Sequence, residues 1–517
     1  MSAHFKWYDA SEEVVVPWNA RYSFPSQANK CTKITPRIPP KNGATFLPGN
    51  VIRLEFPAQG YINPINTTFE FDVTLSTYSI PGTAVVRFQN NIQSIFSRAR
   101  FLYGATPLED IINYNVIVRS LTEWTATNQT MSMDQTSIAE GIGGVVYGYN
   151  GDGSDRGMVN VRQAYIQGID ATATTGFGAV PNQSASPAGY SVSCTRRYQV
   201  NLAFGLLMQD KLLPTKFMAS QLAIELSLAQ ESECILVSAV GSGAGLPPTY
   251  QVSNFNMIPE ILEFDAAYDS AFLRGLQDTG VPIKLSSWHT FIFSVGGSSA
   301  VNLMIQERSR SVKALFAVQR RNPSNLLIDQ GATLFNSATS GTLQNYQYRI
   351  GGRYFPAAPV QLSTSVGSNV PNCGAEAYVE LQKALNIVGD YRLSTSNNSM
   401  RWGQTCAAVT VNGDLTTAQE SDYGCYPLKP SAGGINTYKV IDTPFAGSVG
   451  SSCFTMACDL ETSNGIEISG LNAEEQSDIA LMVNWSQPQA AGYNMEVYSY
   501  FDEMILLKEN NVLELIQ

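Results

Sequence analysis

The stretch EFDAAYDSAFLRGLQDTGVPIKLSSW, residues 263–288, lies near the middle of the 517-residue chain. Its apolar side chains recur at helical spacing, at Ala266, Phe272, Leu273 and Leu276. The DTG tripeptide at 278–280 is typical of a helix end, and the VP pair at 281–282 returns the chain to an extended conformation. Because the segments on its two sides follow one another in a similar order, we interpret this stretch as a helical linker between two related halves.

The first half is dominated by segments whose apolar residues recur with period two, as in half-buried β-strands. In residues 68–75 every second residue is Phe, Val or Leu, and the residues between them are polar. We predict a strand here. Further strands are predicted in this half at 52–56, 85–88, 95–103, 193–204, 222–228, 234–240 and 250–264.

One helix is predicted to interrupt these strands, over residues 107–124. The sequence TPLE at 106–109 matches a capping box with proline at the first helical position, and apolar residues follow at helical spacing. A short helix broken by Pro214 is expected within 205–219. The polar, Gly-rich segment 125–190 is predicted to be a long, elaborated loop.

The second half repeats this order of strands, helix, long loop and strands. A helix is predicted at 375–388, followed by a loop that reaches 452. No alternation of helices and strands of the parallel kind occurs, so antiparallel sheets are favoured. Units of this size suit the eight-stranded jelly roll, although composition and period do not separate it from other β-sandwiches. Strands are predicted in this half at 289–295, 301–306, 312–319, 346–350, 454–460, 479–485 and 495–507.

The composition indicates a globular protein with ample material for more than one core. Apolar residues make up 44% of the chain and charged residues only 15%. Lys and Arg number 32 against 43 Asp and Glu, a formal net charge of -11 that argues against a surface built to neutralise phosphates. The N-terminus lacks the features of a secretory signal, and no apolar run approaches the ~18 residues of a membrane span. We therefore expect synthesis in the cytoplasm without a signal peptide.

The search for metal-binding and nucleotide-binding motifs is negative. The sequence GDGSD at 151–155 resembles part of a calcium loop but lacks the downstream glutamate, so a tight turn is favoured. The glycines at 241–245 lack dinucleotide-binding spacing, and no phosphate-binding loop motif occurs. No CxxC pair occurs either, and buried free thiols are expected. The eight cysteines are Cys31, Cys194, Cys234, Cys373, Cys406, Cys425, Cys453 and Cys458.

Catalytic constellations are also missing. Only two histidines occur, His4 and His289, and a triad would have to use one of them. His289 shares its strand parity with two phenylalanines, so a packed, hydrogen-bonded core histidine is favoured. We predict no catalytic, cofactor-binding or metal-binding residue. The remaining charged pairs, which we interpret as solvated faces or subunit contacts, are Glu12-Glu13, Glu474-Glu475, Arg98 and Arg100, Arg196 and Arg197, and Arg320 and Arg321.

Several stretches resemble double jelly-roll major capsid proteins, the lineage of adenovirus hexons, virophage and polinton-like virus capsid proteins. They are ARFLYGATPLEDIINYNVIVRSLTEW (99–124), AAYDSAFLRGLQDTGVPI (266–283), YRIGGRYFPAAPVQ (348–361) and MEVYSYFDEMILLKENNVLELIQ (495–517). The resemblance implies an all-β protein of two tandem eight-stranded jelly-roll barrels with short helices and long inserted loops. The expected parts are an N-terminal arm (1–45), a first jelly roll (46–264, long loop about 125–190), a linker helix (265–282) and a second jelly roll (283–517, long loop about 389–452).

The resemblance also implies a function. Three copies would form a pseudo-hexagonal capsomer that tiles the icosahedral shell of a double-stranded DNA virus. The implied location is the virion, and the implied partners are neighbouring capsomers, penton proteins and minor capsid proteins. No direct sequence-specific nucleic-acid binding is expected.

Two other kinds of protein remain as alternatives. A carbohydrate-binding or glycan-cleaving β-sandwich is motivated by aromatic residues in the expected loops, but no acid pair resembles that of a glycosidase. A viral receptor-binding spike would share the high strand content, yet the sequence shows no stalk-like repeat. The loop aromatics are Tyr147, Tyr149, Trp402 and Tyr423.

Overall fold

The computed structural model describes the strands and helices of both halves and a part of their connections. The described residues are 31–78, 85–88, 92–125, 168–170, 191–237, 249–278, 280–321, 343–362, 375–388, 409–412, 425–427, 435–440, 454–461, 470–474, 478–486, 488–489, 492–508 and 513–516.

Eight strands of the first half make up the main paths of two antiparallel sheets. The β12 sheet has the order β1-β12-β4-β9, and the β10 sheet has the order β3-β10-β6-β7. Counted along the chain as first to eighth, these strands lie in the orders 1-8-3-6 and 2-7-4-5, as in a jelly roll. The strands are β1 (Cys31–Ile34), β3 (Val51–Glu55), β4 (Tyr61–Tyr78), β6 (Phe96–Tyr103), β7 (Thr106–Ile112), β9 (Ser191–Val200), β10 (Leu222–Leu228) and β12 (Thr249–Phe264).

The second half repeats this arrangement strand for strand. The β23 sheet has the order β13-β23-β15-β21, and the β22 sheet has the order β14-β22-β16-β17. The prediction of two tandem eight-stranded jelly rolls is therefore confirmed. The strands are β13 (Val281–Ser294), β14 (Ala300–Met304), β15 (Val312–Arg321), β16 (Leu343–Ile350), β17 (Arg353–Gln361), β21 (Met456–Asp459), β22 (Ile479–Trp485) and β23 (Tyr493–Leu507).

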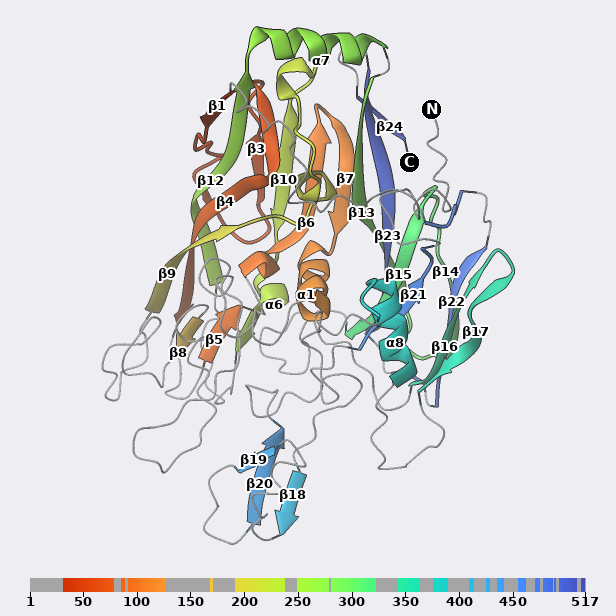
Figure 1. The fold of residues 1–517 in the computed structure, drawn as a ribbon. Helices are drawn as coiled ribbons and strands as arrows, with labels where there is room; N and C mark the ends of the chain where they lie inside the picture. The colour runs from red at the N-terminus through yellow and green to blue at the C-terminus, as the bar shows by residue number, and fades with distance from the viewer. Residues whose placement is uncertain are drawn as a thin grey trace, which may run out of the picture.

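Smaller elements decorate the two barrels. Helices α1 and α8 each follow the fifth strand of their barrel, and two three-stranded sheets lie toward the end opposite α7 (Figure 1). The helices are α1 (Tyr114–Thr125), α5 (Gly205–Met208), α6 (Glu231–Cys234), α7 (Ala266–Asp278) and α8 (Ala375–Ala384), with 3-10 turns η2 (Ile92–Ile95) and η3 (Thr215–Phe217). The remaining strands are β2 (Thr45–Phe46), β5 (Val85–Phe88), β8 (Gly168–Asp170), β11 (Ile235–Val237), β18 (Val409–Asn412), β19 (Cys425–Pro427), β20 (Ile435–Val440) and β24 (Leu513–Ile516).

Alternate residues of each strand fill the cores, as the period of two requires. On β4, Phe69 and Phe71 are fully buried, and the ring of Phe71 stacks on Phe255 at 4.9 Å and meets Phe96 of the facing sheet at 5.8 Å. Burying a phenylalanine side chain contributes about 1.5–3 kcal/mol. The facing aromatic residues therefore hold the β12 sheet and the β10 sheet together.

The helix predicted in the central stretch is present as α7, which carries the chain from β12 to β13 across one end of both barrels (Figure 1). Only Leu276 is buried among the side chains of α7. The helix is anchored by aromatic contacts: the ring of Phe272 packs on those of Phe217 and Tyr61, at 5.3 and 5.5 Å.

The secondary structure differs from the prediction at residues 106–112, and strand β17 was missed. Residues 106–112 form strand β7 and not the start of a helix, because they pair with the open edge of β6, and a positive φ at Asn113 turns the chain into α1. The capping box predicted at 106–109 is therefore absent. Strand β17 was not predicted, because its two prolines mask it, and it is an edge strand, where proline is tolerated.

Over its described part, the segment expected as an arm at 1–45 packs on the first barrel. Strand β1 pairs with β12, Ile38 forms a bridge to Met257, and β2 pairs with β12 near Val252. Residues 31–46 thus lie along the edge of the β12 sheet, and β1 is its edge strand as β13 is the edge strand of the β23 sheet. Residues 1–30 lie outside the described residues, as do the expected loops at 125–190 and 389–452 apart from β8, β18, β19 and β20.

Substitution of Phe272 by alanine tests how α7 is held. We expect cleavage within residues 266–278 to become about tenfold faster in limited proteolysis, since losing two ring contacts lowers local stability by about 1–2 kcal/mol. Leu273→Ala is the control, because this neighbouring side chain is 39% exposed and its loss should change the rate by less than about twofold. Equal rates for both variants would show that the aromatic contacts do not anchor the helix.

Candidate functional site

His289, the one described histidine, is bound to an acid and lacks the surroundings of a triad. Its Nδ1 lies 3.2 Å from both carboxylate oxygens of Glu307, and its side chain is 37% exposed, so it is packed and hydrogen-bonded but not fully buried. The Ser309 hydroxyl donates to the same carboxylate at 2.7 Å. Burial alone would raise the pKa of Glu307, but His289 and Ser309 together lower it to about 2. The acid therefore receives several donors, and among the described residues no serine or cysteine is hydrogen-bonded to the histidine.

Those other sequence candidates that the structure describes do not converge on a reactive centre. Glu474 pairs with Arg310 at the surface, and the pairs Glu12-Glu13, GDGSD at 151–155 and the glycines at 241–245 lie outside the described residues. Cys234 and Cys458 are buried free thiols as predicted, whereas Cys31 is exposed. Within the described ranges, no group of three or more His, Cys, Asp and Glu side chains is placed to hold a metal ion, and no helix is long and apolar enough to span a bilayer.

Three of the arginines noted in the sequence, Arg98, Arg100 and Arg197, form ion pairs on the first barrel. Arg98 contacts Asp110 through two nitrogens, and Arg100 contacts Glu225 at 2.7 Å. Arg197 binds Asp72 through Nε at 2.7 Å and a second nitrogen at 3.0 Å. Such two-point contacts fix the orientation of a guanidinium group.

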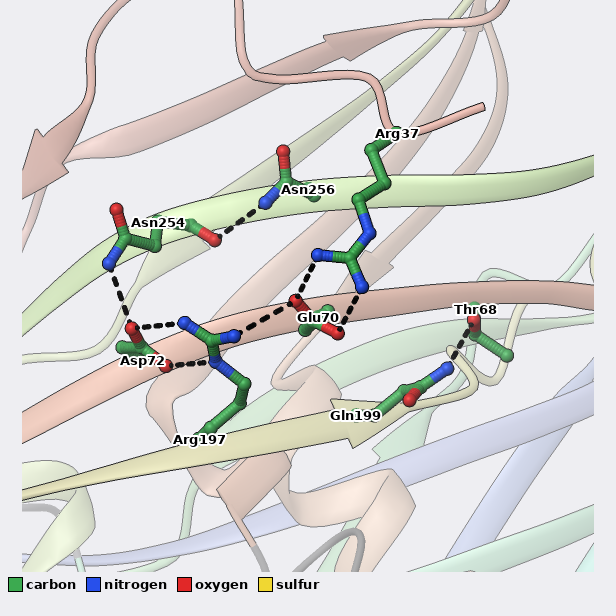
Figure 2. Close-up of polar contacts among 8 residues, drawn as sticks. All are labelled: Arg37, Thr68, Glu70, Asp72, Arg197, Gln199, Asn254 and Asn256. Atoms are coloured by element: carbon green, nitrogen blue, oxygen red, sulfur yellow. Dashed lines mark hydrogen bonds and ion pairs between the residues drawn. The ribbon is translucent and has the colours of Figure 1, made fainter. Parts of the chain in front are cut away.

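The pair of Arg197 and Asp72 belongs to a polar network on the outer face of the β12 sheet (Figure 2). Asn254 donates to Asp72 at 2.8 Å, and Arg37 contacts Glu70 at 3.2 Å. The hydrogen bonds from Arg197 lower the pKa of Asp72, against the effect of burial. Because residues 37, 70, 197 and 254 come from separate segments, the network ties residues 31–46, β4, β9 and β12 together on one face.

A second feature, the barrel junction, joins the two halves. We use this name for the contact of β7, α1, α5 and α6 with β13, β15 and β23. The Glu109 carboxylate of β7 accepts hydrogen bonds from the backbone amides of Gly205 and Leu206, both at 2.8 Å, and from the Ser287 hydroxyl at 2.9 Å. Glu109 is 3% exposed. Burial raises its pKa to about 7, although the three donors oppose that change.

Backbone contacts bring the two halves very close together beside Glu109. A Cβ atom on Gly205 would lie 2.0 Å from the carbonyl oxygen of Ser286, so only glycine fits there. The Thr290 hydroxyl donates to the carbonyl oxygen of Ile112 at 2.8 Å. Strand β7 of the first barrel therefore lies against β13 of the second.

Aromatic packing extends the junction over the outer face of the β23 sheet. The ring of Trp124, at the end of α1, stacks on Phe316 at 4.6 Å, and its indole nitrogen donates to Thr455 at 3.2 Å. Trp288 packs beside Phe316 at 5.7 Å. Phe316 is 1% exposed and Trp288 is 6% exposed, so this face is dry where the first barrel covers it.

A buried ion pair lies at the same junction. Arg320 binds Glu496, and both side chains are at most 5% exposed. The Tyr498 hydroxyl donates to the same glutamate. Burial raises the pKa of Glu233 of α6, and the charge of Arg320 opposes that change across the junction. Breaking such a pair leaves an uncompensated charge and costs several kcal/mol.

A cleft of about 740 Å³ remains between the barrels beside these contacts. Its apolar wall combines Leu121 and Met208 of the first barrel with Leu285, Phe316 and Met504 of the second. The lysines that line it are paired: Lys284 lies 3.2 Å from Asp502, Lys313 lies 3.6 Å from Glu461, and Lys211 lies 3.5 Å from Asp210. The cleft therefore presents no free cluster of positive charge toward a ligand.

The junction was not predicted from the sequence. The sequence pattern indicates Trp124 only as the end of a helix, and it predicts Glu109 as part of the capping box at the start of that helix. Neither Ser287 nor Phe316 carries a local pattern that points to a partner in the other half. The one usable signal was a glutamate among apolar residues in LEDII at 108–112.

Comparison of the chain with known proteins gives matches in structure alone. The sequence matches no protein-family model and no curated protein. A chain in the structure of the Sputnik virophage aligns with a TM-score of 0.53 and 9% identity, over 98% of this chain and 92% of that one. The mavirus major capsid protein aligns with a TM-score of 0.52 and 11% identity, over 97% and 93%.

A further match is the major capsid protein of Faustovirus, with a TM-score of 0.47 and 9% identity, over 97% of this chain and 94% of that one. At these identities the similarity establishes the fold. Both barrels and the connection between them match the double jelly roll of the mavirus and Sputnik structures along nearly the whole chain.

Replacement of Glu109 by alanine tests the junction. We expect a loss of about 3 kcal/mol or more in the free energy of unfolding, because three buried donors lose their acceptor. Glu474→Ala is the control, since this surface partner of Arg310 should contribute at most about 1 kcal/mol. Chemical denaturation of both variants measures the difference, and equal stabilities would contradict the role of Glu109.

The raised pKa of Glu109 gives a second expectation. Between its ordinary value of 4.5 and about 7, the folded state binds a proton that the unfolded state has lost. The contribution of Glu109 to stability therefore falls as pH rises through this window, by about 3 kcal/mol in total. The difference in unfolding free energy between the native chain and Glu109→Gln should follow this fall, and a difference independent of pH would contradict it.

Proposed function

We propose that this chain is a major capsid protein of an icosahedral double-stranded DNA virus. The observation that carries the proposal is the two-barrel topology, whose sheets repeat one strand order twice and align with the mavirus capsid protein over more than nine-tenths of both chains. The role is structural and not enzymatic, and its mechanism is assembly through buried surface between subunits.

In this proposal three copies associate into a capsomer. Two barrels from each of three chains place six barrels around a threefold axis, so the trimer has a nearly hexagonal outline. The barrel junction supports this arrangement because its buried contacts make the two barrels of one chain a single block. A block with a defined angle between its halves is what regular tiling requires.

The proposal also implies a location and a set of partners for the protein. The chain would be located in the capsid of the virion, with neighbouring capsomers, penton proteins and minor capsid proteins as partners. Direct sequence-specific binding of nucleic acid is not part of this role, and the net charge of -11 is compatible with a shell that does not grip DNA. The long segments 125–190 and 389–452 would lie at the outward end of the barrels.

Carbohydrate binding, glycan cleavage or a receptor-binding spike are the alternative functions. The aromatic residues that motivated the first two functions lie outside the described residues. No observation on the described residues favours any of the three functions. The capsid role is therefore the function that the described geometry supports best.

The purified full chain tests the proposal. Light scattering after size-exclusion chromatography should give three times the mass of one chain, and electron microscopy should show particles of hexagonal outline that associate into sheets or shells. A stable monomer at every protein and salt concentration, together with hydrolysis or binding of members of a glycan panel, would favour the alternative.

A further inference from the structure

The outward edge of strand β14 differs from the same edge of β3, its counterpart in the first barrel. In both strands every second residue directs its backbone amide and carbonyl away from the sheet. These are residues 51, 53 and 55 on β3 and residues 300, 302 and 304 on β14. Four backbone hydrogen bonds of 2.7–2.9 Å establish the equivalence: Phe56 to Leu222 and Leu228 to Asn50 in the first barrel, Ile305 to Ile479 and Trp485 to Ser299 in the second.

In the first barrel, the outward edge of β3 is closed by another part of the same chain. The backbone amide of Lys41 donates to the carbonyl oxygen of Arg53 at 2.9 Å. The Asn42 side chain completes the pairing, because its Oδ1 accepts from the amide of Arg53 at 3.0 Å and its Nδ2 donates to the carbonyl oxygen of Val51 at 2.6 Å. An asparagine side chain thus pairs with β3 as a peptide group of a neighbouring strand would.

The second barrel has no such cover because its first strand is continuous. Between β1 and β2 the chain leaves β12, except for the bridge at Ile38, and this detour brings Lys41 and Asn42 to β3. The corresponding strand β13 pairs with β23 without a break over residues 281–294. In the part of the chain that the structure describes, β14 pairs with β22 on one side and with no residue on the other.

The composition of β14 leaves this edge open to pairing. Soluble proteins protect exposed edges with charged residues, proline or a bulge. Strand β3 carries Arg53 and Glu55, whereas β14 has the sequence AVNLM and pairs with β22 without a shift of register. Ala300 and Asn302 are exposed, and the Met304 side chain is 47% exposed. An exposed edge without charge, proline or bulge is a template for a further strand.

We propose that the outward edge of β14 binds an extended segment of a different protein as an added strand, and that this segment carries an asparagine opposite Asn302. The first barrel shows the chemistry of the occupant. A backbone amide is followed by an asparagine side chain, and Pro39 and Pro40 before them favour an extended backbone.

The occupant belongs to another polypeptide, because in this chain the segment of Lys41 and Asn42 is already bound to β3. The same holds for a second copy of the chain. The inference stands on the edge of one barrel and does not depend on the proposed trimer.

A synthetic peptide with the sequence of residues 36–44, PRIPPKNGA, is the probe. Hydrogen exchange measured by mass spectrometry on the full chain reports the amides of residues 299–305. We expect exchange in this segment to slow at least about fivefold with millimolar peptide, because amides that gain a partner are protected. Exchange in residues 51–55 should stay the same, since that edge is already covered.

The matched control is the same peptide with alanine in place of its asparagine. It loses both side-chain hydrogen bonds to the edge and should bind at least about tenfold more weakly. Comparison of the two peptides on the native chain separates strand addition from unspecific adsorption.

Two substitutions at residue 302 test recognition of the backbone. Asn302→Pro removes the outward amide but leaves the pairing with β22, and proline is tolerated on an edge strand. This variant should bind the peptide at least about tenfold more weakly, whereas Asn302→Ala keeps the amide and should bind within about twofold of the native chain. Circular dichroism and the melting temperature verify that both variants are folded. The comparison of the two peptides remains decisive if the proline variant does not fold.

Three results would overturn the proposal. Slow exchange of residues 299–305 without peptide would show that this chain or a second copy already covers the edge. Unchanged exchange at millimolar peptide would show that the edge does not accept a strand. Equal protection by the native and alanine peptides would show that the asparagine is not recognised.

Discussion

A polar group buried between two domains must keep its hydrogen-bond partners, because leaving it unpaired in a dry interior costs about 1–3 kcal/mol or more. Glu109 is in this position, with two donors from its own barrel and one, Ser287, from the other. Neither barrel can slide along the other without removing a donor. The stacking of Trp124 on Phe316 also opposes sliding of one barrel along the other. The barrels consequently act as one body, and every larger arrangement starts from that body.

The two barrels share one topology, but the outer faces of their equivalent sheets, the β12 sheet and the β23 sheet, differ in composition. The β23 sheet carries aromatic residues on its outer face because the first barrel always covers it. The β12 sheet carries the network of Arg37, Glu70, Asp72 and Arg197 on the equivalent face. An apolar face there would invite aggregation, whereas a face whose charges are paired with one another can remain in contact with water.

The sequence predicted those parts of the fold in which a local pattern and the tertiary structure agree. Half-buried strands such as β4 and β10 show their period of two because one face must be apolar, and α7 shows its helical spacing and its stop signal. Residues 106–112 misled us because a capping signal was overridden by pairing with β6. The contact of Glu109 with Ser287 spans 178 residues, and no local pattern reports such a distance.

The closing strands determine when each barrel can form during synthesis. Strand β12 lies between β1 and β4, and Cys31 pairs with Phe264, while Val281 pairs with Leu507 in the second barrel. Neither sheet can close until its eighth strand has left the ribosome, and such distant pairings close slowly. The first barrel is complete in sequence before β13 begins. When β13 is synthesised, β7 of the first barrel is therefore already in place to contact it. The order of synthesis thus favours contact between the two barrels of one chain.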